Sequence, residues 1–137
     1  MWIVLAMLSA GFAALTGIFA KLGMEGINSN LATAIRTVVV LVMAWGIVFL
    51  RGKQAGIAEI TAKGWTYLIL SGAATGLSWL CYFYALQLGE ASRVIPVDKL
   101  SVVLSMVLAF VVLGEKVTLT KIIGGVLIPL GAFVMIR

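Results

Sequence analysis

Five long apolar segments limit what this chain can fold into. A membrane-spanning α-helix needs about 20 mostly apolar residues, whereas a membrane-spanning strand needs about 9–11 residues of alternating polarity. The apolar segments here have helical length and show no such alternation. We therefore predict an all-α membrane protein, a bundle of five transmembrane helices that forms a single domain over residues 1–137. The predicted spans are residues 2–22, 31–50, 65–88, 91–113 and 120–136.

The composition supports a membrane location. Hydrophobic residues make up 63% of the chain and charged residues 11%, against about 45–50% and about 25% in soluble domains. A chain of 137 residues cannot bury that much apolar surface in a core of its own, so a lipid bilayer must cover the excess. The net charge of +5 comes from basic residues scattered at the segment ends, which does not predict nucleic-acid binding.

The sequence offers little for catalysis. Histidine is absent, and Cys81 is the only cysteine, so neither an intramolecular disulfide nor a cysteine-rich metal site is expected. There is no glycine-rich phosphate loop and no embedded pair of carboxylates for acid–base chemistry. We therefore predict that the protein is not an enzyme and has no cofactor and no metal site.

The distribution of basic residues bears on the orientation in the membrane. Five spans place the termini on opposite sides, and each side then carries five basic residues. Setting aside Arg36 and Lys99 as partly embedded in the membrane leaves five against three. The positive-inside rule then favours a cytoplasmic N-terminus only weakly, and insertion in both orientations stays open. The side of the N-terminus holds Arg51, Lys53, Lys63, Lys116 and Lys121, and the other side holds Lys21, Arg36, Arg93, Lys99 and Arg137.

Asp98 and Lys99 lie near the start of the fourth span. Charged side chains cost about 2.5–3.5 kcal/mol each at the centre of a membrane helix, and they mark substrate or ion paths. If Pro96 occupies the first helical position, Asp98 lies at the third, where free amide groups and the helix dipole stabilise it. Alternatively, Asp98, Ser101 and Ser105 share one face and line a cavity. Adjacent helical side chains point about 100° apart, so Asp98 and Lys99 are not expected to pair.

Arg36 and the third span supply the other candidates. Arg36 is either an interface anchor or a cation that faces the bundle and pairs with Asp98 or with an anionic substrate. In the third span, polar residues recur at spacings of four, three and four, with Trp79 at their edge. These hydroxyl groups either bond the preceding turn of the helix or form a cavity wall, in which Trp79 and Tyr82 present aromatic faces to a cationic or aromatic solute. The residues of this stripe are Ser71, Thr75, Ser78 and Tyr82.

The sequence resembles the EamA domain, the repeat unit of the drug/metabolite transporter superfamily. The match covers essentially the whole chain and is strongest from Tyr82 onward. It is carried by the aromatic-Ala-Leu end of the third span, the Ala91-Ser92 turn, the Gly114-Glu115-Lys116 close of the fourth span, the glycine-rich last span and the basic residue at position 36. Most members of the superfamily that this chain resembles have ten spans in two inverted halves. This chain has one half, and its Pro-Val-Asp-Lys segment at 96–99 looks like the short bacterial and archaeal branch.

The resemblance implies a multi-pass plasma-membrane (inner-membrane) transporter of small metabolites or drug-like solutes. Inverted-repeat transporters bind the substrate between their two halves, so a single half provides only one wall of the substrate site. The resemblance therefore also implies an antiparallel homodimer, or a pair with a paralogous half, that works by alternating access. The alternative hypothesis is a non-transporting helical subunit or scaffold that pairs with another membrane protein. The candidate substrate-path residues are Arg36, Thr75, Ser78, Trp79, Tyr82, Asp98, Lys99 and Ser101.

Overall fold

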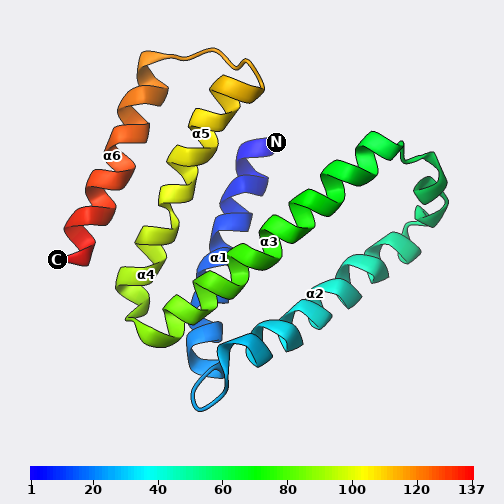
Figure 1. Cartoon of the computed structure of the whole chain (residues 1–137), viewed down its shortest axis with the longest axis horizontal. Coiled ribbons are helices and arrows are strands. Elements are labelled where there is room, and N and C mark those ends of the chain that lie inside the picture. The colour runs from blue at the N-terminus through cyan, green and yellow to red at the C-terminus, as the bar shows by residue number, and fades with distance from the viewer. The chain divides into compact units, whose positions relative to one another are not determined.

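The computed structural model describes all 137 residues, and every regular element in it is a helix (Figure 1). Five segments are long and apolar enough to cross a membrane, with α4 and α5 together forming the fourth. The predicted fold class is therefore confirmed. Each of these five segments begins and ends within three residues of the predicted span. The elements are α1 (Trp2–Gly23), α2 (Ser29–Leu50), the 3-10 helix η1 (Gln54–Glu59), α3 (Ala62–Leu88), α4 (Ala91–Asp98), α5 (Leu100–Val112) and α6 (Leu119–Ile136).

The chain divides into two compact units. Unit 1 comprises Met1–Lys21 and Leu88–Arg137, and unit 2 comprises Leu22–Gln87. Unit 1 thus holds nearly all of α1 together with α4, α5 and α6, whereas unit 2 holds α2, η1 and most of α3. Each unit is described separately below.

Most large apolar side chains are exposed on the isolated chain. Phe12 is 68% exposed, Leu104 66% and Phe133 64%, whereas the fully buried side chains are few. Hydrocarbon solvates such side chains as well as a protein core does, so helices in lipid need not bury them. The outward-facing surface is therefore that of a protein whose solvent is the bilayer.

The fourth span is interrupted near its middle. Pro96 lies inside α4 and has no amide hydrogen, so it cannot donate the helical bond to the preceding turn. The helix breaks at Lys99, whose φ of −67° and ψ of −10° nevertheless stay in the right-handed region, and α5 begins at the next residue. The hypothesis that Pro96 occupies the first helical position is wrong. α4 already begins at Ala91, where the amides of Arg93 and Val94 both donate to the carbonyl of Glu90 at 3.0 Å.

In unit 1, α6 packs against both α4 and α5 (Figure 1). Gly125 on α6 is buried and lies against Met106 of α5. The terminal methyl group of Met106 occupies the position that a Cβ at residue 125 would take. A glycine on α6 thus lets the Met106 side chain approach the helix backbone, which is how small residues promote close packing of membrane helices.

α5 ends at a glycine in the left-handed conformation. Gly114 has a φ of +65°, and the amide of Glu115 donates to the carbonyl of Ala109 at 3.2 Å. This geometry closes the last turn of α5 and turns the chain toward α6, as glycine does at many helix C-termini.

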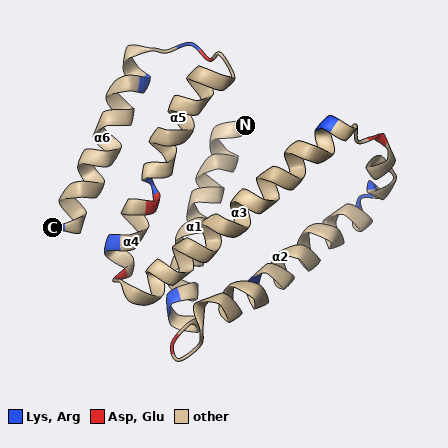
Figure 2. Cartoon of the chain, in the orientation of Figure 1, with Lys and Arg blue, Asp and Glu red and all other residues tan.

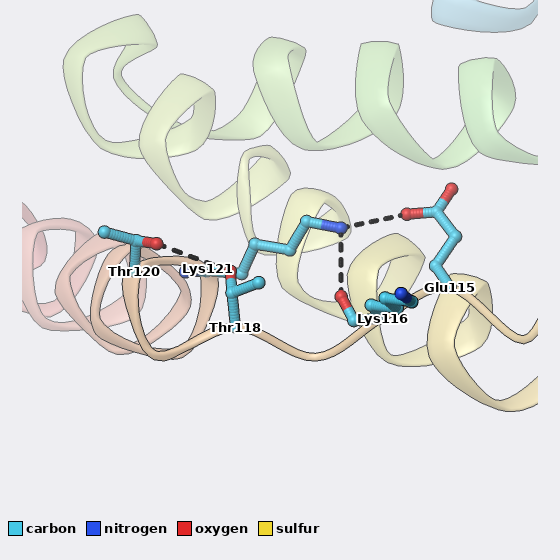
Figure 3. A network of polar contacts seen from close by, with 5 residues as sticks. All are labelled: Glu115, Lys116, Thr118, Thr120 and Lys121. Carbon is cyan, nitrogen blue, oxygen red and sulfur yellow. Dashed lines mark hydrogen bonds and ion pairs between the residues drawn. The ribbon is translucent and has the colours of Figure 1, made fainter.

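Lys121, in the first turn of α6, connects this turn to the next helix. Its Nζ donates to Oε2 of Glu115 at 3.2 Å and to the carbonyl of Lys116 at 3.3 Å (Figure 3). The Thr118 hydroxyl oxygen caps α6 by accepting from the Lys121 amide at 3.4 Å. The ion pair is solvent-exposed, so its main effect is to order the connection, because exposed pairs contribute little stability.

Gly114→Ala is expected to lower the free energy of unfolding by about 1 kcal/mol, because an L residue pays a steric cost of that order in the left-handed region. The matched control is Gly124→Ala, where the backbone is helical and a Cβ would meet no atom within 4 Å. That variant is expected to be neutral or slightly stabilising. SDS-induced unfolding in mixed micelles measures both changes, and equal destabilisation of the two variants would contradict the explanation from backbone conformation.

Candidate functional site

Within unit 2, α2 and α3 run in opposite directions (Figure 1), and residues of both helices line an open groove. The groove has a volume of about 810 Å³ and extends from Asn30, near the start of α2, to Ala44. Its other wall extends along α3 from Leu80 back to Leu68. Much of the lining consists of small side chains, so the two helices leave open space along these walls. These small residues are Thr33, Ala34, Thr37 and Ala44 on α2, and Ser71, Gly72, Thr75 and Gly76 on α3.

The threonine hydroxyl groups of the groove bond to their own helices. Thr33 Oγ1 donates to the carbonyl of Ser29 at 2.7 Å, and Thr37 Oγ1 to that of Thr33 at 2.8 Å. On the opposite wall, Thr75 Oγ1 donates to the carbonyl of Ser71 at 2.9 Å. Because these donor hydrogens are already used, the threonines contribute mainly methyl groups and hydroxyl lone pairs to the groove. The groove is therefore largely apolar and contains no charged lining residue.

A cluster of aromatic rings lies at the end of the groove nearest the start of α2. Phe83 is only 2% exposed, and its ring lies edge-on to Trp79 and Tyr82, with centroid distances of 6.4 and 5.0 Å. Leu86, one turn further along α3, is fully buried. Beyond it, Gln87 Nε2 donates to the carbonyl of Ile27 at 2.7 Å and so ties the end of α3 to the connection before α2. The ring pairs lie within α3 and order its last turns, whereas the Gln87–Ile27 bond links α3 to the connection before α2.

Arg36 is held against this cluster. Its guanidinium carbon lies 3.8 Å from the centroid of the Phe83 ring, a cation–π contact. Its Nη1 is buried and has no hydrogen-bond partner. Arg36 is also the only charged residue in α2 (Figure 2). It is not a lining residue of the groove, although Thr33 and Thr37 on either side of it in the sequence are.

The remaining charged candidates belong to unit 1. Lys99 Nζ lies 3.4 Å from Oδ2 of Asp98, so the prediction that these neighbours do not pair is wrong. The lysine side chain is long enough to reach the carboxylate of the preceding residue, whereas the prediction considered only the directions in which the two side chains leave an unbroken helix. Asp98 is the last residue of α4 and not the third residue of a helix. Ser101, in the first turn of α5, is exposed.

The structure separates the predicted stripe of α3 into two groups. Ser71 and Thr75, with Trp79 at the edge of the stripe, line the groove, whereas Ser78 and Tyr82 are not among its lining residues. For Thr75 both interpretations hold, because its hydroxyl bonds the preceding turn and the residue also forms part of a wall.

Sequence reasoning missed the α2 wall and the ring beneath Arg36. Thr33 and Thr37 are four residues apart, which places them on one helix face, so a signal for this wall was present. Phe83 carried no such signal, because an aromatic residue in an apolar span has no distinguishing pattern. A further contact that was missed is in unit 1, where Lys21 Nζ donates to the carbonyl of Gly89 at 2.8 Å.

Comparison with known proteins gives a consistent result over the whole length. A sequence profile for the EamA-like transporter family matches residues 1–137. A Sinorhizobium protein described as an uncharacterized transporter in the cobO 3′ region is 48% identical over 134 residues, which cover 98% of this chain and 95% of that protein. An uncharacterized protein of Methanocaldococcus jannaschii is 31% identical over 133 residues, covering 97% and 94% respectively. No solved structure matches the chain.

Proposed function

Because this chain belongs to the EamA-like transporter family, we propose that it carries small metabolites or drug-like solutes across the plasma membrane through the groove between α2 and α3. The observation that carries this proposal is the groove itself. Its volume of about 810 Å³ lies in the range of small-molecule sites, about 300–1,000 Å³, and its walls belong to two membrane spans. The relative described as a transporter supports the same function.

The working unit in this proposal is an antiparallel homodimer, or a pair with a paralogous half. Two oppositely oriented copies give the assembly the inverted symmetry with which transporters expose one central site to either side in turn. The near-balance of basic residues on the two sides of the membrane is compatible with insertion in both orientations. Thr75 and Trp79 line the path on this proposal, whereas the roles of Ser78, Tyr82, Asp98, Lys99 and Ser101 stay predictions.

A flux screen in proteoliposomes tests the transport function. A library of small solutes is offered to liposomes that contain the purified chain, with and without a pH gradient, and protein-free liposomes serve as the control. We expect at least one class of solute to enter the liposomes faster than in the control. An absence of flux across the whole library, with folded protein in the membrane, would contradict the proposal.

Reporter fusions at Arg137 test the arrangement of the dimer. We expect reporters on both sides of the membrane and a dimer in mild detergent. Reporters on one side only, together with a monomer, would favour the non-transporting subunit in place of the transporter.

A further inference from the structure

We propose that Arg36 is a binding site for an oxyanion group, a carboxylate or a phosphate, at the end of the α2–α3 groove. The oxyanion comes either from the solute, which would then be an acid with an apolar body, or from a lipid headgroup. The solute case rests on the transport function proposed above, because it assigns the chemical class that the same groove accepts.

The first step concerns the position of the charge. Arg36 lies seven residues after Ser29, the first residue of α2, which is about 10 Å along a helix that rises about 1.5 Å per residue. Ionisable residues inside a span are costly and usually serve a path or a partner. Unit 2 contains two carboxylates, Glu25 and Glu59, and neither forms an ion pair with Arg36. The charge therefore lacks an anionic partner within its unit.

The second step concerns the contacts of the guanidinium group. The Phe83 ring covers one flat face of the group, where it attracts the positive charge but accepts no bond from the N–H groups in the guanidinium plane. One of the in-plane nitrogens, Nη1, is buried and has no acceptor. A buried donor without an acceptor is unfavourable. The ring thus fixes the orientation of a planar fork in which one buried donor, Nη1, still lacks an acceptor.

The third step concerns the ligand that this fork fits. The donors of a guanidinium group match the two oxygens of a carboxylate or phosphate and can bond both at once. Thr33 and Thr37, on either side of Arg36 in the sequence, line the groove, and Trp79, which also lines it, touches Phe83. An oxyanion bound at Arg36 therefore lies beside the end of an apolar groove that can hold the rest of the molecule.

The main test compares three probes that share one ring and differ in the charge of their head group. Benzoate, benzamide and benzylamine are titrated against the full chain in detergent, with Trp79 as the fluorescent reporter. For this purpose Trp2, Trp45 and Trp65 are replaced by phenylalanine. We expect benzoate to bind about tenfold or more tightly than benzamide, and benzylamine to bind most weakly. Equal affinities for benzoate and benzamide, or tightest binding of benzylamine, would overturn the proposal.

Variants of the arginine extend this test. Arg36→Gln is expected to weaken benzoate binding by about tenfold or more and to leave benzamide binding unchanged. Arg36→Lys should retain part of the benzoate affinity, because it keeps the charge but loses the planar fork. Arg51→Gln, which removes an exposed cation beyond the end of α2, is the matched control and should bind benzoate as the parent does. Loss of benzoate affinity in Arg51→Gln equal to that in Arg36→Gln would overturn the proposal. Should Arg36→Gln fail to fold, the three-probe comparison and Arg36→Lys decide.

Two further arms separate the sources of the oxyanion and the two proposals. In the first arm, phosphatidylglycerol is tested as a competitor of benzoate, with phosphatidylcholine micelles as the reference. Competition in the parent, together with no binding of phosphatidylglycerol to Arg36→Gln, would support a site that lipid headgroups also occupy. In the second arm, the flux of benzylamine and of benzoate is measured for the parent and for Arg36→Gln. Transport of benzylamine at the same rate by both, with no transport of benzoate, would overturn the assignment of an acidic solute but would still support the transport function. Benzoate binding that depends on Arg36, without flux of any solute, would support the oxyanion site and contradict the transport function.

Discussion

Gly76→Trp is expected to stop solute flux and leave the chain folded. Gly76 lines the groove, and a Cβ added there would meet no atom within 4 Å. The indole can therefore extend into the groove without displacing the helix backbone, and it takes up the space that a solute needs. We expect the initial flux rate in proteoliposomes to fall by about tenfold or more, because small displacements of a bound molecule already have effects of that size.

The control for this variant is the next residue of the same helix. Leu77 is 65% exposed and does not line the groove, so Leu77→Trp places the same indole toward lipid. That variant should carry solute at close to the parental rate, at equal protein density in the liposomes. If both variants lose flux equally, the groove is not the path.

Phe83→Ala is expected to have the largest effect on stability. The side chain is 2% exposed, and truncation of a buried phenylalanine costs about 3–5 kcal/mol through lost contacts and the cavity left behind. The variant also removes the ring that lies 3.8 Å from the guanidinium carbon of Arg36. We expect the midpoint of SDS-induced unfolding in mixed micelles to shift to a clearly lower SDS fraction.

Phe133→Ala serves as the comparison, because Phe133 lies on α6 and is 64% exposed. Its ring faces the surrounding hydrocarbon in both the folded and the unfolded membrane-inserted chain, so its removal should change the unfolding midpoint little. A shift for Phe133→Ala as large as that for Phe83→Ala would show that burial in this structure does not govern stability.

The spans themselves could be predicted because each apolar segment has the length that a membrane-spanning helix needs. The first turns of α2 and α3, which begin two and three residues before the predicted spans, could not. α2 begins at Ser29, two residues before the predicted span, because the Asn28 side chain accepts from the Asn30 amide at 2.9 Å and so caps a polar first turn. Counting apolar residues overlooks a turn of this kind, in which hydrogen bonding and not hydrophobicity decides where the helix starts.

Pro96 shows where a sound local rule gave the wrong result. The fourth span was predicted to start at residue 91, but the preference of proline for the first position of a helix suggested that helical structure begins at Pro96. In a bilayer, however, a backbone outside helical structure is costly, because no water is present to satisfy its polar groups. The helix therefore forms from Ala91 and continues through the proline, and the interruption falls three residues later at Lys99.

The site was predicted in part for a related reason. Helical spacing grouped the polar residues of α3 on one side, and two of them, Ser71 and Thr75, do line the groove, as does Trp79 at the edge of the stripe. Spacing within one helix does not reveal which neighbour it faces, so the opposite wall on α2 was missed. The placement of Arg36 over Phe83 joins residues 47 positions apart, and only the fold brings them together.

The bonding of the threonine hydroxyls to their own helices has a consequence for selectivity. A wall that offers methyl groups distinguishes two solutes mainly by size, and one methylene group changes binding by only about 10–200-fold. It is equally weak at rejecting an analogue that carries one additional hydroxyl group. We therefore expect a series of solutes with graded ring or chain size to be accepted with gradually changing affinity, without a sharp boundary between accepted and refused compounds.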